Sequence, residues 1–153
     1  MSPFHKESAK RHIPTYVAGM AFHGGVFLSI ATLIPLFFRI EVPLPFIAAV
    51  RAVLIVTAAC GLGLLVKRAV NPKMRHFTGP DDYFSNILVV GFQALTAAAL
   101  FNKSLVPALF IYAGAFFLYI PLGKLRHAVY FPFTRTFLGM YFGKRGVWGS
   151  KRH

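Results

Sequence analysis

Long apolar runs separated by short polar segments dominate the chain. A helix that crosses the hydrocarbon core of a bilayer needs about twenty predominantly apolar residues. Four runs come close to that length: Ile13 to Phe38, Phe46 to Val66, Tyr83 to Phe101, and Leu105 through Pro121 towards His127. This pattern predicts an all-α integral membrane protein that forms a four-helix bundle.

The composition agrees with a membrane protein. Of the 153 residues, 56% are apolar and only 14% are charged, whereas about a quarter of the residues of a soluble protein are charged. Seventeen Phe and six Tyr are more than the interior of so short a soluble chain can hold. We therefore exclude a water-soluble globule and expect the membrane lipid to contact most of the surface.

The linkers define how the runs are paired. The linker after Arg39 and the linker Asn102-Lys103-Ser104 are both short, so runs one and two, and runs three and four, are expected to form antiparallel hairpins. We predict one membrane domain over residues 1–130 and a basic, aromatic tail over residues 131–153. With Tyr141, Phe142 and Trp148, this tail is expected to lie along the lipid headgroups or against a partner.

The distribution of positive charge predicts the orientation. Lys and Arg exceed Asp and Glu by 13, and four spans place both chain ends and the middle loop on one side. That side carries Lys6, Lys10, Arg11, Lys67, Arg68, Lys73, Arg75, Lys124, Arg126, Arg135, Lys144, Arg145, Lys151 and Arg152. The positive-inside rule then places both termini in the cytoplasm and the protein in the inner membrane. Orientation explains the basic excess better than nucleic acid, which we do not expect as a partner.

His23 is the first candidate for chemistry because it lies inside the first span. Ionisable residues at that depth are costly and are usually functional, although a histidine bonded to a neighbouring helix is the alternative. Gly19, Gly24 and Gly25 leave a smooth surface for a flat macrocycle, and such glycines also serve helix packing. Since Cys60 is the only cysteine, any iron must be held by histidine or methionine. We favour His23 as an axial ligand of a b-type haem.

His127 is the second candidate and closes the fourth run. Lys124 and Arg126 lie beside it and can neutralise haem propionates, whereas a simple interfacial basic cluster is the alternative interpretation. His127 and His23 can face each other across the bundle. Counting about 1.5 Å per residue places His127 several ångströms nearer the cytoplasm, a mismatch that helix tilt or distortion at Pro121 would have to absorb.

Two further histidines are alternate ligands. His12 precedes His23 by about three turns on the same helical face, about 16 Å away, and His76 lies in the middle loop. The fourth run has no deeper histidine that could pair with a second haem. We therefore expect one haem, held by His23 and His127.

The middle loop also carries protonatable groups. His76 and Asp82 are candidates for a quinone or proton site near the haem. The alternative is a helix start, in which Pro80, Asp81 and Asp82 cap the third span, and for Asp81 we favour it. Further along the third span, we expect one or both of Asn86 and Gln93 to bond across helices.

Three motifs together resemble the gamma-subunit family of respiratory nitrate reductase. This membrane cytochrome b family also supplies membrane anchors to sulfite-reduction-associated and heterodisulfide-reductase-like complexes. The motifs are Phe22-His23-Gly24-Gly25, Gly79-Pro80-Asp81-Asp82-Tyr83, and Gly123-Lys124-Leu125-Arg126-His127 followed by Tyr130-Phe131-Pro132-Phe133-Thr134-Arg135. The resemblance covers nearly the whole chain.

The resemblance implies a haem site. In that family a five-span subunit holds two b haems, and the haem nearer the cytoplasm is ligated at the positions of His23 and His127. The ligand of the second haem is replaced by Leu33 here, and the family's first span is missing. The resemblance therefore implies a smaller relative with one haem.

These observations predict an electron-transfer subunit of a membrane-bound heteromeric complex. It would relay electrons between menaquinone or ubiquinone in the membrane and a cytoplasmic iron–sulfur or flavin partner. The sequence has no nucleophile–base pair, phosphate loop or cluster ligands, so we do not expect catalysis by the chain alone. A haem-free anchor that docks a soluble enzyme is the alternative, and a transporter is disfavoured because the spans carry almost no inward charge.

Overall fold

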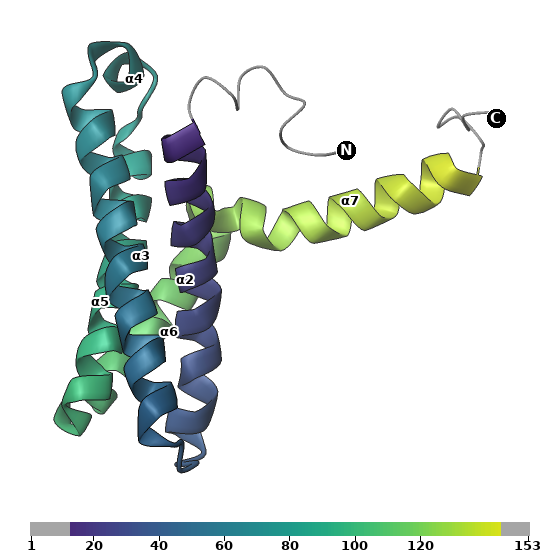
Figure 1. Ribbon diagram of the computed structural model, residues 1–153. Helices are drawn as coiled ribbons and strands as arrows, with labels where there is room; N and C mark the ends of the chain where they lie inside the picture. Colours follow the sequence, from purple (N-terminus) through teal and green to yellow (C-terminus); the bar gives the residue numbers. More distant parts are fainter. Residues whose placement is uncertain (1–12, 145–153) are drawn as a thin grey trace. The chain divides into compact units, whose positions relative to one another are not determined.

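The computed structural model describes residues 13–144, apart from the side chains of Lys73, Ala128, Val129 and Lys144. Over this range the backbone is helical and contains no strand (Figure 1). The elements are α2 (Ile13–Phe37), α3 (Leu44–Val70), α4 (Pro72–His76), α5 (Pro80–Phe101), η2 (Lys103–Leu105), α6 (Val106–Leu122), η3 (Lys124–Arg126) and α7 (His127–Lys144). The all-α prediction is confirmed for the described residues.

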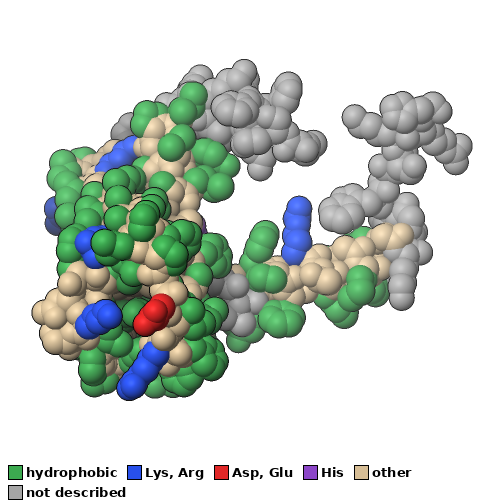
Figure 2. All heavy atoms as spheres, turned by 60° about the horizontal axis from the view of Figure 1, so that its bottom comes forward, with side chains coloured by type: hydrophobic (Ala, Val, Ile, Leu, Met, Phe, Trp, Pro, Cys, Tyr) green, Lys and Arg blue, Asp and Glu red, His purple; other side chains and the backbone are tan. Residues whose placement is uncertain are grey.

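Four segments of the described chain are long and apolar enough to cross a membrane. They are α2, α3, α5 and the continuous stretch Lys103–Leu122 that joins η2 to α6. Large apolar side chains are exposed along these helices and cover much of the face seen in Figure 2. Four such helices with apolar outer surfaces are the organisation of a multi-pass membrane protein.

The described chain forms two compact units, with the division between Phe116 and Phe117 inside α6. This division is based on the packing within each unit. The domains predicted from the sequence, 1–130 and 131–153, are instead based on which residues lie in the membrane, and they stay a prediction. Trp148 and the basic residues at both chain ends lie outside the described residues.

In the first unit, α3 packs against both α2 and α5, and these helices run side by side in Figure 1. Leu54, Phe92, Leu109 and Phe116 are its largest fully buried apolar side chains. The rings of Phe92 and Phe116 stack with centroids 4.8 Å apart and hold the first part of α6 against α5.

The α2–α3 hairpin closes through a residue in the left-handed region. Arg39 has φ 52°, and the N–H of Ile40 donates to the Pro35 carbonyl at 2.9 Å, so the last turn of α2 is capped by the reversing chain. Pro43 and Pro45 then begin α3, where a missing N–H costs no intrahelical bond. The predicted hairpin between the first two spans is thus formed.

Arg51 of α3 has a structural role at the C-terminal end of α5. Its guanidinium donates to the Leu100 carbonyl at 2.7 Å and lies 3.7 Å from the centre of the Phe101 ring. A cation at a helix C-terminus neutralises the partial negative charge of the last carbonyls. This contact ties α3 to the end of α5.

The fourth span ends earlier than the sequence pattern predicts. It was expected to continue towards His127, but α6 stops at Leu122 and His127 instead begins α7. Gly123 is extended, and its N–H donates to the Tyr119 carbonyl at 2.9 Å. A Cβ at Gly123 would lie 2.1 Å from the Tyr119 ring, so a larger residue at this bend would require that ring to move.

Candidate functional site

Two neighbouring helices fix α2 at the turn that carries His23. The ring of Phe22 lies against α3, where a Cβ on Gly61 would meet it at 2.3 Å. From α5, Gln93 Nε2 donates to the Phe22 carbonyl at 2.9 Å. One contact holds the side chain of Phe22 and the other holds its backbone, so α2 cannot rotate or slide here without breaking both.

Gln93 is fully buried and joins three helices. Its Oε1 accepts a hydrogen bond from Thr57 Oγ1 of α3 at 2.8 Å, while its Nε2 bonds α2. Gly25 makes this close approach possible, because a Cβ there would lie 2.2 Å from Thr57 Oγ1 and 2.6 Å from Gln93 Oε1. The prediction that Gln93 bonds across helices is confirmed.

His23 lies on the opposite side of this turn and is exposed. Its Nδ1 is 2.7 Å from the Gly19 carbonyl, one helical turn earlier. A carbonyl oxygen only accepts, so Nδ1 carries the hydrogen and Nε2 of the neutral ring keeps its lone pair. Among the described residues, no hydrogen bond to Nε2 is formed, and the His23 ring meets the Phe22 ring edge-on with centroids 6.1 Å apart.

The glycines around His23 have different surroundings. A Cβ built on Gly19 or on Gly24 would meet nothing within 4 Å, whereas Gly25 is pressed against α3 and α5. The expectation of a smooth open surface was therefore wrong for Gly25, because Thr57 and Gln93 occupy the space beside it. Gly19 and Gly24 leave open surface beside the imidazole, and Gly25 serves helix packing.

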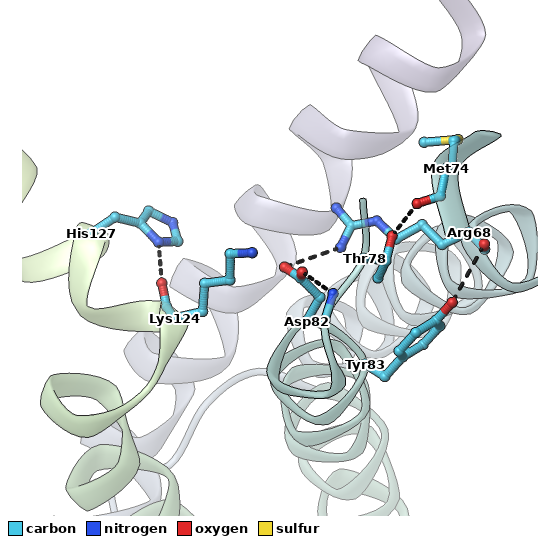
Figure 3. A network of polar contacts seen from close by, with 8 residues as sticks. Arg68, Met74, Thr78, Asp82, Tyr83, Lys124 and His127 are labelled. Atoms are coloured by element: carbon cyan, nitrogen blue, oxygen red, sulfur yellow. Dashed lines mark hydrogen bonds and ion pairs between the residues drawn. The ribbon is translucent and has the colours of Figure 1, made fainter. Parts of the chain in front are cut away.

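His127 shows the same local arrangement in the second unit. It is exposed at the start of α7, and its Nδ1 is 2.6 Å from the Lys124 carbonyl of η3 (Figure 3). Nδ1 again carries the hydrogen, so in the neutral imidazole Nε2 is the nitrogen with the free lone pair. Lys124 and Arg126 flank the ring on η3, and both are exposed. His23 and His127 belong to different units, so their pairing on one haem stays a prediction.

The start of α5 explains Asp82 in structural terms. Its Oδ2 accepts the N–H of Gly79 at 3.0 Å, and its Oδ1 lies 4.0 Å from the Arg68 guanidinium of α3 (Figure 3). Pro80 occupies the first turn of α5, so the helix-start interpretation holds for Pro80 and Asp82. A role of Asp82 in quinone or proton chemistry stays a prediction.

Of the two alternate histidines, the structure describes only His76. His76 ends α4, is exposed, and meets the Phe77 ring edge-on with centroids 6.4 Å apart. His12 lies outside the described residues. Between residues 13 and 144, no three His, Cys, Asp or Glu side chains come together. A haem iron takes only two axial protein ligands, so this finding concerns sites for bare metal ions.

The sequence did not indicate that Thr57 and the Phe22 carbonyl are the partners of Gln93. For Thr57 the only signal in the sequence was a hydroxyl inside an apolar run, and a backbone carbonyl such as that of Phe22 leaves no signal in the sequence.

Two buried oxygens, Ser29 Oγ and Asn86 Oδ1, have no hydrogen-bond partner within the described structure.

Comparison of the chain with protein-family models, curated proteins and solved structures gave no match.

Proposed function

We propose that this chain is a membrane subunit that holds one b-type haem and relays electrons between a quinone and a cytoplasmic oxidoreductase. The observation that carries the proposal is the hydrogen bonding of His23 and the open surface beside it on a membrane helix. Its Nδ1 is bonded to the Gly19 carbonyl, and the surface at Gly19 and Gly24 is open. We also propose that the chain belongs to the nitrate reductase gamma-subunit family that its motifs resemble.

The imidazole geometry favours a ligand over a packing histidine. Metal-ligating histidines almost always donate their other ring N–H to a carbonyl, a carboxylate or water, which fixes the tautomer and the ring plane. His23 and His127 each do so through Nδ1. A histidine placed in a span for packing alone would be expected to use both nitrogens, because an unbonded ring nitrogen in hydrocarbon is costly.

The residues of the chain have distinct proposed tasks. His23 and His127 would hold the iron, Gly19 and Gly24 would leave room for the ring, and Lys124 and Arg126 would pair with the propionates. Bound haem supplies a one-electron carrier within the membrane. Gln93 acts through Phe22, because its bond to that carbonyl keeps His23 on the open side of α2.

A quinone and a soluble partner complete the proposed relay. Menaquinone or ubiquinone would exchange electrons with the haem from the lipid, and His76 and Asp82 would be the candidate groups for its protons. An iron–sulfur or flavin subunit binds on the cytoplasmic side. The sequence from Tyr83 to its last residue contains no Asp or Glu, so this part of the chain suits an acidic partner surface.

The proposed orientation places both termini on the cytoplasmic side of the inner membrane. Reporters fused at each end should be active only when the reporter is one that works in the cytoplasm. An exported reporter that is active at residue 153 would reverse the orientation and move the haem to the other side.

An optical spectrum of the purified protein, with histidine variants, tests the haem. We expect a Soret band and a reduced-minus-oxidised alpha band in the native protein, and loss of both in His23→Ala and His127→Ala. His76→Ala is the matched control and should keep the native spectrum. A native protein without these bands would instead be the haem-free anchor. A native spectrum in His23→Ala would transfer its ligand role to His12 or His76, and loss of the spectrum in His76→Ala would make His76 a ligand in place of His127.

A further inference from the structure

Helix α7 presents an unusual amount of aromatic surface. Phe133 is 72% exposed, Phe137 is 65% exposed and Phe131 is 63% exposed. At 100° per residue, the large apolar side chains occupy about three-fifths of the circumference of α7. The remaining two-fifths contains Arg135, Thr136, Gly139 and Gly143, together with Ala128 and Pro132. Aromatic surface of this extent is rarely left in water, so it requires a partner.

Chain continuity places the start of α7 at the membrane surface. The fourth candidate span ends at Leu122, and only Gly123 and the three residues of η3 precede His127. Four residues reach at most about 14 Å when fully extended. Whatever direction α7 takes, its first turn therefore lies in or next to the headgroup layer of the bilayer that α6 crosses.

A return into the membrane as another span is unfavourable for α7. It has 18 residues but is not among the helices apolar enough to cross, and Arg135 lies at its middle. A charge at the bilayer centre costs at least about 2.5 kcal/mol. An orientation along the surface lets the aromatic rings enter the acyl region and leaves Arg135 at the level of the phosphates.

The charges of the second unit fit an anionic membrane. From Phe117 onward the sequence has no acidic residue and carries Lys124, Arg126, Arg135, Lys144, Arg145, Lys151 and Arg152. Each basic residue near an anionic lipid surface contributes about 1 kcal/mol of attraction. The two threonine hydroxyls need no outside partner, because Thr136 donates to the Pro132 carbonyl at 2.8 Å and Thr134 to the Tyr130 carbonyl.

We propose that α7 is an interfacial helix that lies in the plane of the membrane, with Phe137 among the lipid chains, Gly139 towards water, and Arg135 at the phosphates of anionic lipids. This role is independent of haem, since it depends on the surface of α7 alone. It would anchor the basic second unit along the headgroups.

Labels on opposite sides of α7 test the proposal in the full chain. In a Cys60→Ala background, a fluorescent label is attached at Phe137→Cys or at Gly139→Cys, and the protein is reconstituted into vesicles of phosphatidylcholine and phosphatidylglycerol. We expect nitroxide-labelled lipid to quench the label at residue 137 and aqueous iodide to quench the label at residue 139. Tyr130→Cys and Gly143→Cys form a second pair, should a member of the first fail to insert.

Three results would overturn the proposal. Equal quenching of both labels by iodide would show that α7 stands in water. Protection of the label at residue 137 from both quenchers would show that a protein, such as a second copy of the chain, covers the aromatic surface. A contrast between the labels that is unchanged in pure phosphatidylcholine would remove the role of anionic lipid. We expect the contrast to shrink there and at high salt.

Discussion

Gly24 and Gly25 are neighbours in the sequence, yet their surroundings differ completely. A methyl group on Gly25 would lie 2.2 Å from Thr57 Oγ1, whereas a methyl group on Gly24 would meet nothing within 4 Å. Successive residues of a helix point about 100° apart. One pair of glycines can therefore serve a packed interface and an open surface at the same turn.

The difference shows how packing on one side of α2 determines what the other side presents. Phe22 and Gly25 are buried on the side of α2 that faces α3 and α5. From α5, Gln93 donates a hydrogen bond to the backbone carbonyl of Phe22. His23 lies between Phe22 and Gly25 in the sequence and is consequently turned outward. The direction of the candidate ligand is thus set by contacts in which His23 takes no part.

The largest expected effect is that of filling the packed side. Gly25→Ala places a methyl group where Thr57 and Gln93 now stand, so the Thr57–Gln93 hydrogen bond must break or the helices must separate. We expect a loss of about 2 kcal/mol in the free energy of unfolding. The free energy of unfolding is measured on the purified protein in mixed micelles, by reversible unfolding with increasing amounts of a denaturing detergent.

Gly61→Ala is a second test of the same packed side, because its methyl group would meet the Phe22 ring. A destabilisation comparable to that of Gly25→Ala is expected. If both variants unfold like the native protein, the helices are farther apart than described, and the contrast between the two neighbouring glycines disappears.

The sequence predicted the spans well because it records hydrophobicity directly. The ends of α2 and α5 lie within a few residues of the predicted ends, and Gln93 stood out as an amide inside an apolar run. The end of α6 was missed because hydropathy does not record where a helix bends, and here the chain bends at Gly123, beside the Tyr119 ring.

The candidate site was predictable only in part. His23 and its glycines are visible as residue types in the sequence. Which glycine packs and which stays open depends on the rotation of α2, and that is fixed by Thr57, Gln93 and the ring of Phe22. The carbonyls that bond the two histidines are backbone groups without a sequence signal.

A smaller effect is expected when the bond across the helices is removed. Gln93→Leu keeps the volume but deletes the bonds to Thr57 and to the Phe22 carbonyl. Buried side-chain hydrogen bonds between membrane helices contribute about 0.6 kcal/mol on average, so we expect a loss of about 1 kcal/mol, measured by the same unfolding. With α2 less firmly held, haem content per protein should also fall.

Thr96→Val is the matched control for Gln93→Leu. Thr96 is as deeply buried on α5, but its hydroxyl bonds the Phe92 carbonyl of its own helix at 2.7 Å. The control should retain the native haem content. Equal haem content in Gln93→Leu would show that the bond to Phe22 does not position His23.

The smallest effect on stability is expected on the open side, where it has the opposite sign. Gly24→Ala adds a methyl group without a clash, and replacing glycine inside a helix stabilises it by up to about 1 kcal/mol. Gly63→Ala is matched to it, since Gly63 of α3 is also exposed with nothing within 4 Å. Both variants should unfold at a slightly higher concentration of denaturing detergent than the native protein.

The haem content of the two variants should differ, because only Gly24 lies beside His23. Gly24→Leu should lower the haem content further than Gly24→Ala. A destabilised Gly24→Ala would mean that this side of α2 is packed. Native haem content in Gly24→Leu would mean that the ring does not approach α2 at this glycine, even if His23 remains its ligand.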